Sequence, residues 1–130
     1  MKTYALAVGI VQFNDQVLVL KRNPNKRFDP NKWEFVSGFI KEHETVEETI
    51  LREIKEETTL IPEAIEPGKI FEVNDKYGKW IVIPFLAKVN STNLKLSEEH
   101  TEFKWIKTKE LKKFEAVADL KKDLESVGLI

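Results

Sequence analysis

The chain has 130 residues, of which 42% are hydrophobic and 33% charged, and its formal net charge is −1. These values predict a single domain, residues 1–130, that folds in water, and they exclude the compositions of disordered and membrane proteins. The absence of cysteine excludes disulfides, thiolate metal sites and a cysteine nucleophile, so a bound metal needs oxygen or imidazole ligands.

The first third of the chain predicts a β-hairpin followed by a long loop. Residues 4–13 and 16–20 are rich in Val, Ile, Leu and Ala and are separated by Asn14 and Asp15, which favour a turn. Residues 21–32 contain two prolines, three asparagines and many charges, which is typical of a loop. A short strand is expected at residues 33–36.

The rest of the chain predicts helix, strands and helix in that order. Within residues 44–60, Val46, Ile50 and Ile54 recur every four positions among strong helix formers. Strands are expected at residues 69–73, 80–89 and 103–106, with a turn at 76–79, and helical segments at 108–114 and 117–127. This order predicts an α+β or a three-layer α/β/α domain.

Charge is distributed unevenly along these elements. Residues 1–37 carry six basic and three acidic side chains, whereas residues 38–60 carry three basic and seven acidic ones. A basic segment beside an acidic one is typical of a site that grips phosphates and cations, and equally of an ordinary charged surface.

Three carboxylates share one face of the predicted helix. Glu53, Glu56 and Glu57 stand three and four residues apart, so they repel one another by a few tenths of a kcal/mol per pair. A divalent cation would remove this repulsion, and Mg²⁺ is favoured because it prefers hard oxygen ligands. The alternative is a solvated acidic face balanced by Arg52 and Lys55, but the apolar stripe beside the carboxylates favours a cleft.

The spacing of these residues matches a longer pattern. Five residues separate Gly38 from Glu44, seven separate Glu44 from Arg52, and the sequence then reads REIKEETTL to Leu60. This arrangement resembles the Nudix box of the Nudix hydrolases and meets eight of its nine specified positions. The departure is Thr59, which stands where the family usually has glycine, and we therefore expect the helix to end differently.

The resemblance implies a fold and a reaction. The fold is α/β, a Nudix-type α/β/α sandwich with a mixed β-sheet, and the reaction is attack of water on phosphorus in a pyrophosphate linkage. Such a pyrophosphohydrolase uses Mg²⁺, with Mn²⁺ as the alternative metal.

The resemblance also implies roles for individual residues. The metal ligands would be three carboxylates and one backbone carbonyl, namely Glu53, Glu56, Glu57 and Gly38. Arg52 would hold the glutamates through charge-assisted hydrogen bonds. Glu44 would orient this group, or would be a simple carboxylate at the helix start.

Three glutamates are candidates for the general base. The base is Glu53 on the helix, or Glu98 or Glu99 in the later segment LSEEH, where surface acids are an equal alternative.

Phosphate contacts are expected from the basic strand end and loop, first Arg22, then Lys21 and Arg27. Several aromatic residues are candidates for stacking a base or for the core, namely Phe28, Trp33, Phe35, Tyr77 and Trp80.

Residues 96–111 bear on the substrate. They are similar to a stretch of the Nudix branches that hydrolyse nucleoside triphosphates and dinucleoside polyphosphates, so we predict a nucleoside polyphosphate substrate. The alternatives are ADP-ribose, a capped or triphosphorylated RNA 5′ end, and a Nudix-like binding module without catalysis.

Partners and location follow from composition. The chain has no extended basic surface, which disfavours nucleic acid. No apolar stretch approaches the roughly 20 residues of a membrane span, and the N-terminus lacks a signal-peptide pattern, so we expect a cytoplasmic protein without a membrane partner. The oligomeric state is left open, with a homodimer as one alternative.

Overall fold

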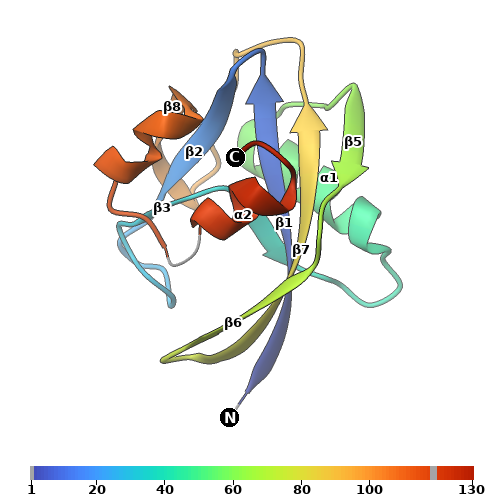
Figure 1. The fold of residues 1–130 in the computed structure, drawn as a ribbon, viewed down its shortest axis with the longest axis vertical. Coiled ribbons are helices and arrows are strands. Elements are labelled where there is room, and N and C mark those ends of the chain that lie inside the picture. Colours follow the sequence, from blue (N-terminus) through green and yellow to red (C-terminus); the bar gives the residue numbers. More distant parts are fainter. Residues whose placement is uncertain (1, 118–119) are drawn as a thin grey trace.

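The computed structural model describes residues 2–117 and 120–130, and Figure 1 shows their arrangement. The strands are β1 (Thr3–Phe13), β2 (Gln16–Arg22), β3 (Trp33–Glu34), β4 (Val36–Phe39), β5 (Ala64–Pro67), β6 (Phe71–Asp75), β7 (Gly78–Lys88) and β8 (His100–Lys107). The helices are α1 (Val46–Thr58), a 3₁₀ helix η1 (Thr108–Lys113) and α2 (Leu120–Ser126). No helix among the described residues is long and apolar enough to cross a membrane.

The strands form one eight-stranded mixed sheet around a parallel pair. β1 and β7 run parallel from Thr3 opposite Lys79 to Gln12 opposite Lys88, and the other pairings between the named strands of the described residues are antiparallel. Both central strands carry nearly continuous apolar runs, as expected for strands covered on both faces. The predicted hairpin of β1 and β2 and the predicted mixed sheet are confirmed.

The core lies on both faces of the sheet, which gives three layers. On one face Ile50 and Ile54 of α1 pack against Ala7 and Val11 of β1. On the other face Leu120 and Leu124 of α2 pack against the β1 residues that alternate along the strand with Ala7 and Val11. Figure 1 shows α2 in front of the central strands and α1 behind them. The predicted α/β/α sandwich is therefore confirmed.

The start and end of α1 are well defined. Thr45 and Glu48 form a capping box, so the helix begins at Val46. The prediction of a helix over residues 44–60 placed Glu44 inside it, whereas Glu44 lies just before the helix. At the other end Thr59 adopts the left-handed conformation, with φ of 66°, and its N–H donates to the carbonyl of Lys55. The expectation that the helix ends differently is wrong, because threonine adopts the backbone geometry that glycine usually supplies.

Other predictions need small corrections. β6 begins at Phe71 rather than at residue 69, and β5 was not expected. The predicted strand 33–36 is divided, because β3 pairs with β2 whereas β4 pairs with β1. The predicted helical segment 108–114 is the 3₁₀ helix η1, and the predicted helix 117–127 is α2 from Leu120 onward, with residues 118–119 of that prediction outside the described residues.

Candidate functional site

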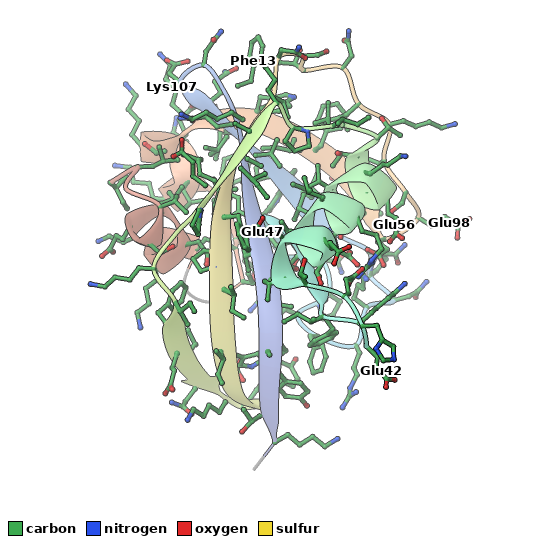
Figure 2. The ribbon with its side chains drawn as sticks, turned by 90° about the vertical axis from the view of Figure 1, so that its right-hand side faces the viewer. Phe13, Glu42, Glu47, Glu56, Glu98 and Lys107 are labelled. Atoms are coloured by element: carbon green, nitrogen blue, oxygen red, sulfur yellow. The ribbon has the colours of Figure 1, made fainter. Side chains whose placement is uncertain are left out.

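The acidic face of α1 lies over β4 at the edge of a pocket. Glu53 and Glu57 are largely covered, whereas the Glu56 side chain is 56% exposed. Figure 2 shows Glu56 at the surface of α1 and Glu98 at the surface of the loop before β8. The three predicted carboxylates therefore share one helix face, with burial that differs sharply among them.

Arg52 holds the carboxylates in order. Its guanidinium donates two hydrogen bonds to Glu44, of 2.7 and 2.9 Å, and Nη1 donates to Glu53 at 2.5 Å and to Glu56 at 3.3 Å. The Arg52 guanidinium, followed by the hydroxyl of Thr49, lowers the pKa of Glu44 to about 2. The structure thus places Arg52 where the resemblance implies, with Glu44 as its anchor.

Gly38 allows β4 to approach the helix closely. A Cβ at Gly38 would lie 2.3 Å from Cδ of Glu53 and 2.7 Å from its Oε1, distances that no real side chain tolerates. The glycine therefore lets the Glu53 carboxylate lie directly against the β4 backbone, which brings two predicted metal-binding residues together.

Glu57 is a buried carboxylate with no hydrogen-bond partner. Its exposed fraction is 1%, and neither of its oxygens bonds to any of the described residues. Burial raises its pKa well above the ordinary value, and the neighbouring Glu53, Glu34 and Glu99 add to that effect. An unpartnered buried carboxylate is costly, and a cation is the natural group to offset that cost.

A second buried network lies on β2, β3 and β8. Arg22 Nη1 donates to Glu34 Oε1 at 2.6 Å, and His100 Nε2 lies 2.7 Å from Glu34 Oε2. Arg22 Nε also donates to the carbonyl of Phe28, which fixes the loop after β2. Glu34 and His100 had no predicted role, because their contact depends on the pairing of β2 with both β3 and β8.

Only some of the residues predicted to contact phosphate line the pocket. Arg22 and Arg27 line the pocket, although two donors of Arg22 already bond to protein acceptors. Lys21 pairs with Glu102 at 3.3 Å and does not line the pocket. Lys26 lines the pocket and was missed, although it lies in the same basic loop.

Of the two later glutamates, Glu99 is the one that approaches the carboxylates of α1. Glu57, Glu99 and His100 each offer a ligand atom, and these three atoms lie within 4.8 Å of one another. Glu98 is exposed, and its backbone carbonyl accepts a hydrogen bond from Asn23. A role for the Glu98 side chain stays a prediction.

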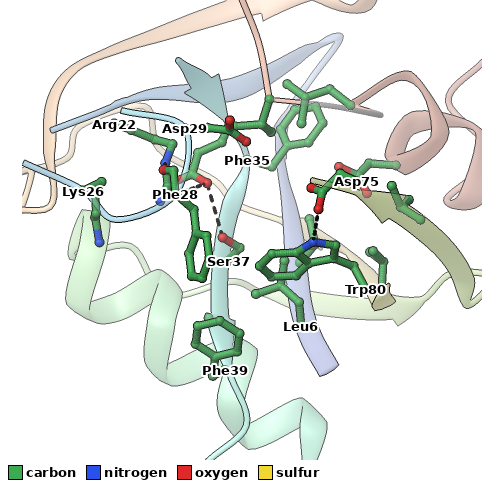
Figure 3. A pocket seen from close by; sticks show the side chains of 18 of the residues that line it. Leu6, Arg22, Lys26, Phe28, Asp29, Phe35, Ser37, Phe39, Asp75 and Trp80 are labelled. Carbon is green, nitrogen blue, oxygen red and sulfur yellow. Dashed lines mark hydrogen bonds and ion pairs between the residues drawn. The ribbon is translucent and has the colours of Figure 1, made fainter. Parts of the chain in front are cut away.

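The pocket has a volume of about 470 Å³ and joins the acidic site to an aromatic wall. Figure 3 shows Phe28, Phe39 and Trp80 around it. Trp80 stacks on Tyr4 with ring centroids 4.4 Å apart, and its Nε1 donates to Asp75 at 2.9 Å. Phe28 and Trp80 therefore line the pocket, and a role in stacking a base stays a prediction for both.

The other aromatic candidates take different places. Trp33 is buried beside Phe114, and Phe35, which is 1% exposed, lines the pocket. Tyr77 packs edge-on against Phe28 and does not line the pocket.

Comparison with known proteins identifies similar domains. A family model described as "NUDIX domain" matches residues 3–125. The ADP-ribose pyrophosphatase of Methanocaldococcus jannaschii is 37% identical over 103 residues, which cover 75% of this chain and 59% of that protein. The RNA pyrophosphohydrolase of Hahella chejuensis is 41% identical over 63 residues, which cover 48% of this chain and 37% of that protein. The chain thus spans less than two thirds of either relative.

A solved structure with the same fold is the NUDIX domain of Shewanella oneidensis NrtR complexed with ADP ribose. It superimposes with a TM-score of 0.82 over 97% of this chain and 86% of that one, at 20% sequence identity. At this identity the likeness supports the fold, including the sandwich of helices around a mixed sheet.

Proposed function

The chain belongs to the NUDIX domain family, whose model it matches over residues 3–125, and from this premise we propose that it is a metal-dependent pyrophosphohydrolase acting on a nucleotide. The observation that carries the proposal is the buried, unpartnered carboxylate of Glu57 beside Glu53 on the acidic face of α1. The donor set fits a hard divalent cation, because it consists of carboxylate oxygens and a nearby backbone.

Four residues would hold the metal, namely Gly38 through its carbonyl and Glu53, Glu56 and Glu57 through their carboxylates. We propose Mg²⁺, with Mn²⁺ as the alternative. When bound, the metal neutralises phosphate oxygens and lowers the pKa of water.

The protein's own groups position this chemistry. Arg52 fixes Glu53 and Glu56 while Glu44 fixes Arg52. The proton of the attacking water would pass to Glu53, or to Glu98 or Glu99 in the loop before β8, and of these two Glu99 lies nearer the carboxylates of α1.

We propose a nucleoside polyphosphate as substrate, either a nucleoside triphosphate or a dinucleoside polyphosphate. The pocket supports this because aromatic side chains that suit a stacked base, basic side chains that suit phosphate, and the Glu53 carboxylate all line it, the basic ones including Arg27 and Lys26. A cytoplasmic location, where nucleotides are abundant, belongs to the same proposal.

ADP-ribose is a second candidate substrate. It is favoured by the 37% identity to a protein named ADP-ribose pyrophosphatase, and it also carries a base and a pyrophosphate. A triphosphorylated RNA 5′ end is a weaker candidate, supported by the shorter match to an RNA pyrophosphohydrolase.

A substrate screen with Mg²⁺ tests the proposal. Nucleoside triphosphates, dinucleoside polyphosphates, ADP-ribose and triphosphorylated RNA are incubated with the protein, and products are separated by chromatography. We expect cleavage of at least one pyrophosphate linkage, reduced at least a hundredfold in Glu57→Gln and Glu53→Gln, since each substitution removes a proposed metal ligand. Equal product from wild type and both variants would contradict the proposal.

A further inference from the structure

His100 is oriented by a fixed carboxylate. The His100 side chain is 1% exposed, and its Nε2 lies 2.7 Å from Oε2 of Glu34. The other oxygen of Glu34 accepts a hydrogen bond from Nη1 of Arg22 at 2.6 Å, so each carboxylate oxygen of Glu34 has its own partner. In the neutral imidazole, Nε2 of His100 donates to Glu34 and Nδ1 then carries the lone pair.

Nδ1 of His100 faces a group that also lacks a partner. It lies 3.7 Å from Oε1 of Glu57. Nδ1 and both Glu57 oxygens are buried, and none of the three has a hydrogen-bond partner among residues 2–117 and 120–130. Native proteins rarely leave buried polar atoms unpartnered, and three facing one another indicate a ligand between them.

The spacing of these atoms suits a metal ion. Two donor atoms that each lie about 2.1 Å from one cation stand roughly 3.0 to 4.2 Å apart. The 3.7 Å between Nδ1 of His100 and Oε1 of Glu57 falls in this range. The three ligand atoms of Glu57, Glu99 and His100 lie within 4.8 Å of one another, so a shift on the order of 1 Å would complete the site.

Glu99 is free to make that shift. Its side chain is 48% exposed on the loop before β8, and its ion pair with Lys26 is long, at 3.6 Å. Exposed ion pairs of this kind contribute little, so a cation can replace Lys26 as the partner of Glu99.

We propose that Glu57, Glu99 and His100 form a mixed nitrogen and oxygen metal site that selects a divalent transition metal such as Mn²⁺ over Mg²⁺. Imidazole suits transition metals, whereas Mg²⁺ prefers an all-oxygen shell. Glu34 completes the arrangement as the carboxylate that orients a metal-bound histidine. The inference rests on the proposed function through Glu57, which it shares with the proposed magnesium ligands.

The direct test is pulsed EPR of Mn²⁺ added at one equivalent to the substrate-free protein. We expect ¹⁴N modulation from a coordinated imidazole in the wild type and its loss in His100→Gln, whose amide can still bond to Glu34. The chain has only two histidines, and the other, His43, has a side chain that is 89% exposed. His43→Asn is therefore the matched control, expected to keep the modulation, because asparagine tolerates the positive φ of that position.

Calorimetric titration with MnCl₂ and MgCl₂ measures the selectivity. We expect His100→Gln to weaken Mn²⁺ binding by about 10- to 100-fold and Mg²⁺ binding by less than about threefold. Glu99→Gln, an exposed substitution that does not threaten folding, should weaken Mn²⁺ binding while the ¹⁴N modulation remains. Circular dichroism of the metal-free variants checks that each is folded.

The outcomes separate this inference from the proposed function. Absence of ¹⁴N modulation in the wild type, or equal Mn²⁺ affinity in wild type and His100→Gln, overturns the site at His100. Nitrogen coordination in a protein that cleaves no substrate in the screen overturns the proposed function and supports the site.

Discussion

Glu44 couples the stability of the site to pH. Its pKa is about 2 in the folded protein against an ordinary value of 4.5, because Arg52 and Thr49 donate to it. Between these values the unfolded chain binds the proton more readily, so the stabilisation is complete above pH 4.5 and is lost as the pH falls toward 2.

Urea unfolding measured from pH 6 to pH 3 tests this coupling. We expect the free energy of unfolding to fall across this window, and to fall less in Glu44→Gln, which has no carboxylate to titrate. Identical slopes for the two proteins would show that Glu44 is not the group responsible.

Glu57 changes stability with pH in the direction opposite to Glu44. Burial raises its pKa in the folded protein, so its contribution to stability is greatest at low pH and declines as the pH rises above its ordinary value of 4.5. A bound cation compensates for the charge, and at a hundredfold excess over its dissociation constant it adds about 2.7 kcal/mol.

Thermal unfolding at pH 7.5 with Mg²⁺ or with EDTA measures that effect. We expect Mg²⁺ to raise the Tm of the wild type by several degrees and to raise that of Glu57→Gln much less. Without metal, Glu57→Gln should be at least as stable as the wild type, because a neutral amide costs less to bury. A less stable metal-free variant would argue against an unpartnered Glu57 carboxyl group.

At the scale of elements, two glycines set how closely α1 approaches the sheet. A Cβ at Gly9 would meet Cγ1 of Ile50 at 2.9 Å, whereas one at Gly38 would meet the carboxyl carbon of Glu53 at 2.3 Å. The first contact belongs to the core and the second to the site, so alanine at the two positions should have different consequences.

Gly9→Ala is expected to destabilise the fold by about 1 to 3 kcal/mol through overpacking, with Mg²⁺ affinity little changed. Gly38→Ala should instead displace the Glu53 carboxylate and weaken Mg²⁺ binding by tenfold or more. Calorimetric titration and urea unfolding of both variants measure the two effects, and equal loss of metal binding in both would contradict the distinction.

Local sequence predicts those parts of the molecule whose partners lie nearby in the chain. The apolar repeat of Val46, Ile50 and Ile54 predicts α1 and its buried face, and the metal-binding glutamates lie on the same helix. β5 escapes prediction because Ala64–Pro67 contains a proline and a glutamate and no buried residue, and it is a strand through its pairing with β7.

The same limit applies within the site. The contact of His100 with Glu34 requires β2 to lie between β3 and β8, with Arg22 opposite His100. No local pattern encodes such a register, whereas the box from Gly38 to Leu60 is contiguous and could be read directly. At Thr59 the local sequence is misleading, because threonine alone disfavours the left-handed backbone that the end of α1 imposes on it.

At the scale of the whole molecule, one pocket extends from α1 and β4 to β6 and the first residues of β7. Trp80 forms part of its aromatic wall, held by Asp75 and Tyr4. If a nucleobase stacks there, Trp80 contributes to substrate binding and not to the reacting groups.

Trp80→Leu is therefore expected to raise KM for the substrate by about tenfold, since stacking a base is worth about 1 to 3 kcal/mol, with kcat changed less than threefold. Trp80→Phe should restore most of the affinity. Trp105→Phe, which alters a tryptophan outside the pocket, serves as the control for general effects on packing. An unchanged KM in Trp80→Leu would place the base elsewhere.

The parallel pairing of β1 with β7 has a consequence for how the chain folds. The N-terminal strand finds its central neighbour only when residues 79–88 are available, about two thirds of the way along the sequence. Because closing so long a loop is slow, folding should take milliseconds to seconds rather than microseconds. During synthesis on the ribosome, the apolar edge of β1 that pairs with β7 therefore stays unpaired until β7 emerges. We expect the chain to be most prone to aggregate during this interval.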